Sequence, residues 1–430
     1  LKAQPVKNPN SIAILSCLLL AVLGARTACA QISVPQVQLP SLPVQTPSLE
    51  RPLERTLDTA QNLRRLRVRD LLRTQRKVVD SDPRGEPIVR SEVLAISPNE
   101  AALAKAQSLG FAVVRTRVLD EIGLSIVVLR APEGMSTRRA LKTLQQADPA
   151  GSYDFNNLYL ETGDVAASRA SSQNPPAAIP TNLKLGLIDG GVDRSHPVFA
   201  ATQVHEHGCD QPHPTVHGTA VGSLLAGHSA QFEGAAPNAQ LYAADVYCGE
   251  ATGGAVDAIA NAFGWLIRER VAVINVSLVG PANRILEQVV HLAIERGHLV
   301  VAAVGNDGPS APVLYPAGYP GVIGVTGVDA RHHVLVEACR GEHVQFAALG
   351  VDLSAATLDH SYAPVRGTSF AAPLIAGMLA RMVHEPDRAK AESAVLTLTS
   401  KAVDLGPRGR DKIYGHGFID VPIRFENRDK

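Results

Sequence analysis

Three short segments each carry a residue type that takes part in acyl transfer. Asp189 ends the apolar run "LGLID", His217 begins "HGTAVG", and Ser369 lies in "GTSFAAP". A serine hydroxyl attacks a carbonyl poorly unless an imidazole accepts its proton, and a carboxylate must orient that imidazole. Taken alone, the three residues also fit a turn, a packed histidine and a helix cap. Together, in the order Asp, His, Ser, they predict a nucleophilic triad.

The same segments resemble the signature segments of subtilisin-like serine peptidases. They read "LIDGGVDRSHP", "HGTAVG" and "GTSFAAP", and the resemblance extends from about residue 183 to 421. It implies that Asp189 orients His217, that His217 is general base and then general acid, and that Ser369 forms an acyl-enzyme. The segment "VVAAVGNDG" resembles the family's oxyanion-hole segment and implies that the Asn306 amide stabilises the tetrahedral intermediate. No cofactor is implied.

Substrate-binding residues are implied by the same resemblance. The segment "INVSLVG" resembles the strand beside the substrate, so Ser277, Leu278 and Gly280 are expected to bind the peptide backbone as an added strand. Leu314 stands where relatives that accept large side chains have a glycine. We therefore expect a shallow primary pocket for small or medium side chains.

The chain also departs from the family's pattern. Gly191 stands where Ser or Thr is common, and Ala220 stands where many members have a second histidine. The connection "SAQFEG" is short, so the loop that wraps a calcium ion in many relatives is not expected, and no metal is predicted.

The elements that position these residues alternate along the chain. Apolar runs predict strands at 183–189, 239–247, 271–279, 298–306 and 321–329, and helical periodicity predicts helices at 219–228, 255–270 and 284–297. Such alternation indicates a parallel sheet covered on both faces, with ligands bound beyond the carboxyl ends of its strands. The expected fold class is α/β, a subtilisin-like three-layer parallel sheet with helices on both faces, over residues 181–430.

A smaller domain precedes this one. Residues 88–161 predict the order β-α-β-β-α-β, which is that of a ferredoxin-like α+β domain. In the family that the chain resembles, a domain of this kind is a propeptide that assists folding and delivers its end into the active cleft. The resemblance thus implies a self-processing precursor whose partner is its own N-terminal domain. We expect self-cleavage between Leu160 and Pro180, and the Pro-rich stretch within 162–180 reads as a linker.

The first residues resemble an export signal. Lys2 and Lys7 precede an apolar run, and "ACA" ends a predicted signal peptide at residues 1–30. A lipid-modified Cys29 is the alternative, which Arg26 disfavours. The protein is therefore expected to be secreted or periplasmic, without a membrane span.

Residues 31–87 combine a Pro-rich linker with a basic, helical segment at 53–79. The latter is either a solvated helix face or a surface for an acidic partner or anionic lipid.

Composition and cysteine count add limits. The chain has 41 Lys plus Arg and 41 Asp plus Glu, so its net charge gives no indication of nucleic-acid binding. The protein is expected to be a monomer. Beyond the signal, three cysteines remain, and Cys209–Cys248 is the expected disulfide, with two unpaired buried thiols as the alternative. The histidines around Cys209 fit no strong metal-ligand spacing and are read as part of a polar loop.

The function expected from these observations is a secreted serine endopeptidase made as a self-processing precursor. The alternative is a catalytically silent peptide-binding protein whose N-terminal domain is a permanent plug. A peptidase needs an activated Ser369, whereas a plugged binding protein does not.

Overall fold

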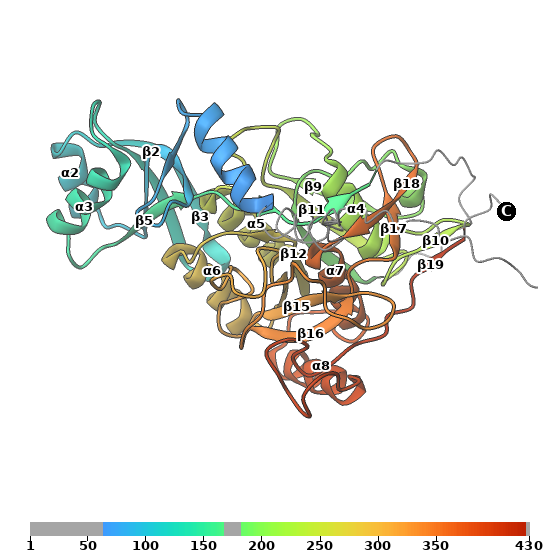
Figure 1. The fold of residues 1–430 in the computed structure, drawn as a ribbon. Helices are drawn as coiled ribbons and strands as arrows, with labels where there is room; N and C mark the ends of the chain where they lie inside the picture. The colour runs from blue at the N-terminus through green and yellow to red at the C-terminus, as the bar shows by residue number, and fades with distance from the viewer. Residues whose placement is uncertain (1–62, 167–181, 427–430) are drawn as a thin grey trace, which may run out of the picture. The chain divides into compact units, whose positions relative to one another are not determined.

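The computed structural model describes residues 63–166 and 182–426 (Figure 1). The predicted signal peptide and most of the predicted linker lie outside these ranges. Within them, no helix combines the length and the apolar character that crossing a bilayer requires.

A parallel sheet dominates the described part of the chain after residue 182. Its strands lie in the order β16-β15-β14-β12-β8-β11-β9, with all neighbours parallel. The strands are β8 (Lys184–Asp189), β9 (Val204–His207), β11 (Gln240–Asp245), β12 (Val273–Val276), β14 (Leu299–Ala303), β15 (Ile323–Val328) and β16 (Val344–Leu349). The α/β class expected from alternating strands and helices is confirmed.

Helices cover both faces of this sheet. One face packs on α4 (Val216–Ala226), α7 (Thr368–Ala380) and α8 (Arg388–Lys401), and the other on α5 (Val256–Arg268) and α6 (Arg284–Glu295). Successive side chains of a strand point to opposite faces of the sheet. On β8, Leu187 therefore packs in the core beneath α4, α7 and α8, and Ile188 packs in the core beneath α5 and α6. The central strands β8 and β14 are therefore apolar on both sides, whereas the edge strand β9 is polar and partly exposed.

Smaller elements complete this domain. The hairpin β17 (Leu353–Ala356) and β18 (Tyr362–Arg366) leads into α7. Strands β10 (Phe232–Glu233) and β19 (Arg424–Phe425) pair near the C-terminal end, and a 3₁₀ turn, η2, spans Pro197–Phe199.

The N-terminal domain has the predicted element order. It contains β2 (Pro87–Ile96), α2 (Glu100–Ser108), β3 (Ala112–Leu119), β4 (Leu124–Arg130), α3 (Thr137–Ala147) and β5 (Ser152–Asn157), with the 3₁₀ turn η1 at Asp120–Ile122. Strand β2 pairs with both β4 and β5, and β3 pairs with β4, all antiparallel. Strand β1 (Val79–Ser81) also pairs with β2, so this sheet begins before the expected residue 88.

Two further segments before residue 167 contact the larger domain. Residues 63–74 are helical and are called the basic helix below. Residues 160–165, called the crossing segment, form β6 (Leu160–Glu161) and β7 (Asp164–Val165). Strand β6 pairs with β13 (Leu278–Val279), and β7 pairs with β18.

Candidate active site

The predicted triad residues lie together at the carboxyl edge of the sheet. Asp189 is the last residue of β8, and Asp189 Oδ1 lies 2.9 Å from His217 Nδ1. Ser369, at the second position of α7, is fully buried, and His217 is 5 % exposed. A buried carboxylate that accepts from Nδ1 fixes the imidazole's orientation and stabilises its positive charge.

The first turn of α4 brings His217 to Asp189. Thr215 caps the helix by accepting from the backbone N–H of Gly218 at 2.9 Å. Gly218 rests on the Gly190 backbone, where an added Cβ would lie 2.3 Å from the Gly190 carbonyl oxygen. The absence of a side chain at Gly218 is what permits this close approach.

The start of α7 does not fit the alternative interpretation of Ser369 as a helix cap. Its N-cap is Gly367, at φ 140°, so Ser369 is one position inside the helix and does not cap it. Pro373, four residues later, has no N–H to bond the Ser369 carbonyl. Ser277 Oγ donates to that carbonyl instead, at 3.0 Å. Ser277 is thereby tied to the backbone of the nucleophile.

Asn306 lies beside the start of α7. Its Oδ1 accepts from the Thr368 N–H at 3.1 Å, which turns the amide toward the Ser369 region. Asn306 Nδ2 is buried and has no hydrogen-bond partner within the described ranges. This amide is therefore a donor available to a developing oxyanion.

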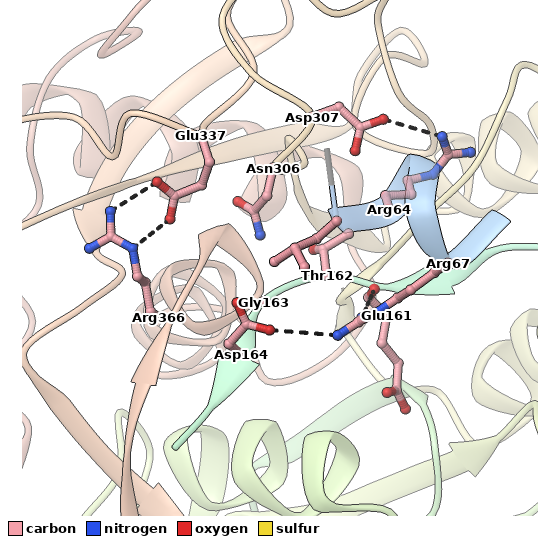
Figure 2. A pocket seen from close by; sticks show the side chains of 11 residues that line it. Arg64, Arg67, Glu161, Thr162, Gly163, Asp164, Asn306, Asp307, Glu337 and Arg366 are labelled. Atoms are coloured by element: carbon pink, nitrogen blue, oxygen red, sulfur yellow. Dashed lines mark hydrogen bonds and ion pairs between the residues drawn. The ribbon is translucent and has the colours of Figure 1, made fainter. Parts of the chain in front are cut away.

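The crossing segment passes through the site, where Glu161, Thr162, Gly163 and Asp164 lie between Asn306 and the basic helix (Figure 2). Thr162 is 3 % exposed and its hydroxyl bonds Ser369 Oγ. Gly163 has φ 111°, and an added Cβ would lie 2.7 Å from the Phe370 ring. Since β6 and β7 are paired on either side, the chain lies in the site as an extended peptide would.

The imidazole of His217 contacts an acceptor at each nitrogen. Nδ1 faces Asp189, and Nε2 lies 3.0 Å from the carbonyl oxygen of Thr162. Because both partners only accept, both nitrogens must carry protons. Burial opposes this charge, and the Asp189 carboxylate is the main group that favours it. With Glu161 and the Thr162 carbonyl contributing as well, the pKa of His217 rises to about 9.

Comparison with known proteins identifies the family of the chain. The model described as the subtilase family matches residues 181–417, more than half of the chain. The chain belongs to the subtilase family.

The matched region covers a different share of the length of each relative. The minor extracellular protease Epr of Bacillus subtilis is 31% identical over 246 residues, which are 55% of this chain and 38% of Epr. Subtilisin E of the same species is 32% identical over 252 residues, 56% of this chain and 65% of that protein. Subtilisin DY of Bacillus licheniformis is 32% identical over 266 residues, 60% of this chain and 94% of that protein. The chain thus matches less than two thirds of the first two relatives.

A solved structure supports the fold. Fervidolysin from Fervidobacterium pennivorans, described as a keratinolytic enzyme related to subtilisin, superimposes with a TM-score of 0.66 at 21% identity. The match covers 80% of this chain and 61% of fervidolysin. The subtilisin-like fold is therefore confirmed.

The residues expected to bind substrate lie in different surroundings in this subtilase, and Leu278 is the one that pairs with the crossing segment. Leu278 is paired with Glu161 in the β6–β13 ladder. Gly280 bonds the backbone of Tyr315 and lies against the Tyr159 ring, where an added Cβ would be 2.7 Å away. Leu314 is 4 % exposed and lies against Gly305, just before Asn306.

Gly191, a departure from the subtilase pattern, has a local cause. An added Cβ there would lie 2.4 Å from the carbonyl oxygen of His213. The Gly191 carbonyl also accepts from the Thr215 N–H, directly before the catalytic helix. Glycine is thus required by the close approach of the 213–215 chain.

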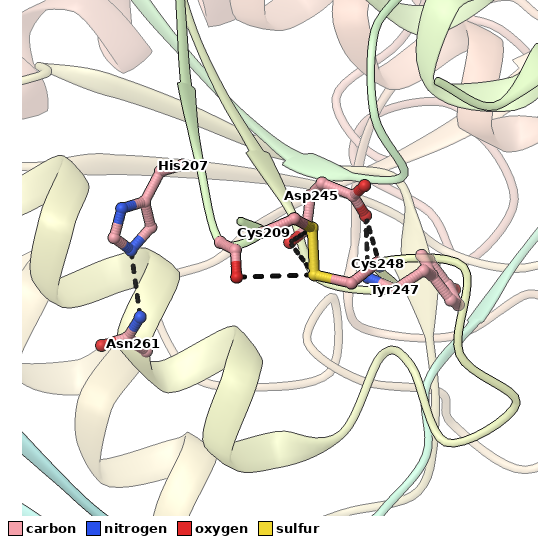
Figure 3. Close-up of a disulfide and its surroundings, with 7 residues drawn as sticks. His207, Cys209, Asp245, Tyr247, Cys248 and Asn261 are labelled. Carbon is pink, nitrogen blue, oxygen red and sulfur yellow. Dashed lines mark hydrogen bonds between the residues drawn. A yellow bond between two sulfur atoms is a disulfide. The ribbon is translucent and has the colours of Figure 1, made fainter. Parts of the chain in front are cut away.

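The predicted disulfide is present (Figure 3). Cys209 and Cys248 connect the chain just after β9 with the chain just after β11. Asp245 supports the second strand end by accepting from the backbone N–H groups of Tyr247 and Cys248. Cys339 is buried as a free thiol.

Of the histidines near Cys209, His213 lies in a loop as the polar sequence predicts, whereas for His205 and His207 the loop prediction is wrong. His205 and His207 are on β9, where they stack on Tyr242 and Trp265 with ring centroids 4.4 and 4.8 Å apart. Aromatic stacking accounts for both side chains.

Sequence reasoning missed several residues at the site. Glu161 lies near His217, and Arg64 and Arg67 of the basic helix reach the same pocket. Arg64 is only 7 % exposed, so the solvated-face interpretation is wrong for this residue. A run of arginines with few acids was the one available signal, and it does not reveal partners that are distant in the sequence.

Proposed function

We propose that this subtilase is a secreted serine endopeptidase, made as a precursor that cuts its own chain at the Thr162–Gly163 bond. One observation carries the proposal: a buried Asp-His-Ser arrangement has an extended segment of the same chain lying across it. The named relatives are proteases, and one is called extracellular. The Cys209–Cys248 disulfide supports an oxidising compartment.

The chemistry assigned to the triad is acyl transfer. Ser369 Oγ attacks the carbonyl carbon of the scissile bond while His217 Nε2 accepts the hydroxyl proton. The carbonyl oxygen becomes an oxyanion that the Asn306 amide and the Ser369 backbone N–H stabilise. His217 returns the proton to the leaving amine, and water then hydrolyses the acyl-enzyme by the same steps. Asp189 holds the imidazole throughout.

The N-terminal domain is proposed to act as the propeptide. Arg115 on β3 bonds both Asp257 on α5, at 2.7 Å, and Glu92 on β2, at 2.8 Å. Asn156 on β5 bonds the same two carboxylates. The buried charges of α5 are thus matched by the N-terminal domain, which supports a specific docked partner.

The residue beside the nucleophile supports the predicted side-chain preference. Thr162 is of medium size, and its side chain contacts Ser369. We therefore propose that the mature enzyme cleaves after small or medium residues. Cleavage after Phe or Tyr as fast as after Thr in a peptide library would contradict this.

The test of the proposed function is the intact mass of the full chain and of its Ser369→Ala variant during incubation. We expect the parent to yield a fragment that begins with Gly163, and the variant to stay whole at that bond. If both chains stay whole, or if both are cut at that bond, self-processing through Ser369 is wrong.

A second candidate function is a peptide-binding protein with a permanent plug. It is favoured by the crossing segment, because Ser369 Oγ bonds Ser277 O and Thr162 rather than His217 in the described structure. Labelling by a fluorophosphonate separates the two functions, since it needs an activated serine. We expect Ser369 to be labelled once the N-terminal piece has left.

A further inference from the structure

The basic helix lies over the crossing segment and contacts the chain on both sides of the Thr162–Gly163 bond (Figure 2). Arg67 Nη1 donates to the carbonyl oxygen of Glu161 at 3.2 Å. The other terminal nitrogen, Nη2, lies 3.6 Å from Asp164 Oδ1. One guanidinium therefore contacts a backbone carbonyl before the bond and a side-chain carboxylate after it.

Arg64 ties the same helix to the oxyanion region. Its Nη1 lies 3.2 Å from Asp307 Oδ2, and its guanidinium also bonds Glu86. Asp307 follows Asn306 directly, and the Arg64 side chain is 6 % exposed. A buried arginine between two carboxylates is a strong point of attachment because its donors are shielded from water.

The bond under this helix is held in a geometry that does not react. The Thr162 carbonyl oxygen lies 3.0 Å from His217 Nε2, the atom that has to accept the serine proton. Asn306 Nδ2, which attack would require as an oxyanion donor, is without a partner in the described ranges. Reaction needs the carbonyl to turn away from His217 and toward Asn306.

We propose that the basic helix is a latch that slows self-processing, with Arg67 and Arg64 holding the Thr162 carbonyl against His217. This inference rests on the proposed function, since it concerns the same bond. The latch is separate from the β-α-β-β-α-β domain: it precedes β1 in the chain and contacts the site directly. Release of the helix frees the carbonyl to turn and lets His217 lose its proton.

The first experiment measures processing in the full chain with Arg64→Ala and Arg67→Ala combined. Arg73→Ala is the matched control, because Arg73 lies on the same helix, is largely exposed and, among the described residues, pairs with Asp70 alone. We expect the fragment beginning with Gly163 to form roughly tenfold faster or more in the double variant, since hydrogen bonds to charged groups are of that strength. The control should process at the parent rate. An unchanged or slower rate in the double variant overturns the latch.

A milder variant tests the role of Arg67 in case the double variant does not fold. The Arg67 side chain is 47 % exposed, so Arg67→Gln removes its charge without emptying a core position. We expect this variant to process faster than the parent with an unchanged melting temperature. The same rate as the parent would contradict the role of Arg67.

A readout independent of catalysis separates failure of the latch from failure of the peptidase. In the Ser369→Ala background, amide hydrogen exchange of residues 158–166 reports opening of the segment. We expect exchange to be about tenfold faster or more with Arg64→Ala and Arg67→Ala than with Arg73→Ala. Equal exchange overturns the latch even if processing occurs. Faster exchange without any cleavage in the Ser369 chain retains the latch and rejects the proposed function.

Discussion

At the scale of single residues, His217 has a different environment before and after processing. In the precursor, Asp189, Glu161 and the Thr162 carbonyl together raise its pKa to about 9, against burial. Glu161 and Thr162 belong to the N-terminal piece, so these two influences end when that piece dissociates after the proposed cut. A protonated imidazole cannot accept the serine proton, and we therefore expect processing to accelerate as pH rises through about 9.

Substitution of Glu161→Gln tests this electrostatic coupling. The amide keeps the size of the side chain but removes the negative charge, so the pKa of His217 falls. We expect the midpoint of the processing rate against pH to move to lower pH. The mature enzyme made from this variant should keep the parent's pH profile on a peptide, because residue 161 has left. An unmoved midpoint would show that Glu161 does not act on His217.

The same contacts affect the stability of the precursor. The folded-state pKa of His217 is raised, so protonated His217 adds to the free energy of unfolding of the precursor. This added stability is complete below about pH 6.5 and is lost as pH rises through about 9. Melting of the Ser369→Ala precursor across this range measures it without interference from cleavage.

At the scale of elements, the start of α4 decides whether the triad assembles. A Gly→Ala change inside a helix ordinarily gains about 1 kcal/mol. At Gly218 the added methyl group would meet the Gly190 carbonyl at 2.3 Å, which the backbone cannot relieve without moving His217. The local clash is therefore expected to outweigh the helix propensity.

Gly218→Ala should lower turnover about 10²-fold, since a shift of about 1 Å in a catalytic group has an effect of that size. Gly222→Ala is the control on the same helix, because its nearest neighbours are side chains of Leu241 and Val192 at 3.3 Å. We expect this control to retain most of its activity on a peptide. Equal activity of the two variants would mean that the α4 contact does not position His217.

Comparison of elements shows which of them sequence can predict. Strands such as β8 and β14 were predictable because both of their faces are apolar. Strand β9 was not, since "VHEH" has the composition of a loop and becomes a strand through its pairing with β11. The helical character of 63–74 was predictable, but Arg64 and its partner Asp307 are 243 residues apart. Triad residues carry a motif, whereas the contacts of the basic helix carry none.

At the scale of the whole molecule, two features stabilise different parts of the chain. One is the charged network between the N-terminal domain and α5, centred on Arg115. The other is the Cys209–Cys248 disulfide, which closes the chain that leads from β9 through α4 to β11. The first governs how long the N-terminal piece stays, and the second stabilises the mature domain.

Loss of Arg115 should shorten the time for which the N-terminal piece stays bound and blocks the active site after the proposed cut. Arg115→Ala removes the nearest counter-ion of the buried Asp257 and Glu92 and leaves them only the more distant Arg117 and Arg130, at 3.6 and 3.9 Å; breaking such a buried pair costs up to about 3–5 kcal/mol. We expect peptide-hydrolysing activity to appear about 10²-fold sooner or more after processing. Arg139→Ala, on the exposed side of α3, should leave the delay unchanged. A delay equal to that of the parent in Arg115→Ala would rule out this network as the main attachment.

Removal of the disulfide should destabilise the folded chain. For a sequence separation of 39, the loop-entropy estimate is about 4 kcal/mol. We expect the Cys209→Ser, Cys248→Ser variant to melt roughly 10 °C lower than the parent. A reducing agent should lower the melting temperature of the parent and not that of the double variant. Equal melting of the two chains without reductant would contradict the estimate.

The pairing of β6 with β13 and of β7 with β18 holds both ends of the bond that is cut. As long as both pairings last, the new Thr162 carboxylate and the new Gly163 amine remain neighbours. Groups held in this way react as if at effective molarities of about 10⁵–10⁸ M. This value exceeds the concentration of water, so rejoining by the Gly163 amine is favoured over hydrolysis by water. We therefore expect nicked and resealed chains to interconvert while the complex persists. Departure of the N-terminal piece then makes the cut irreversible, so the commitment to maturation is a dissociation event.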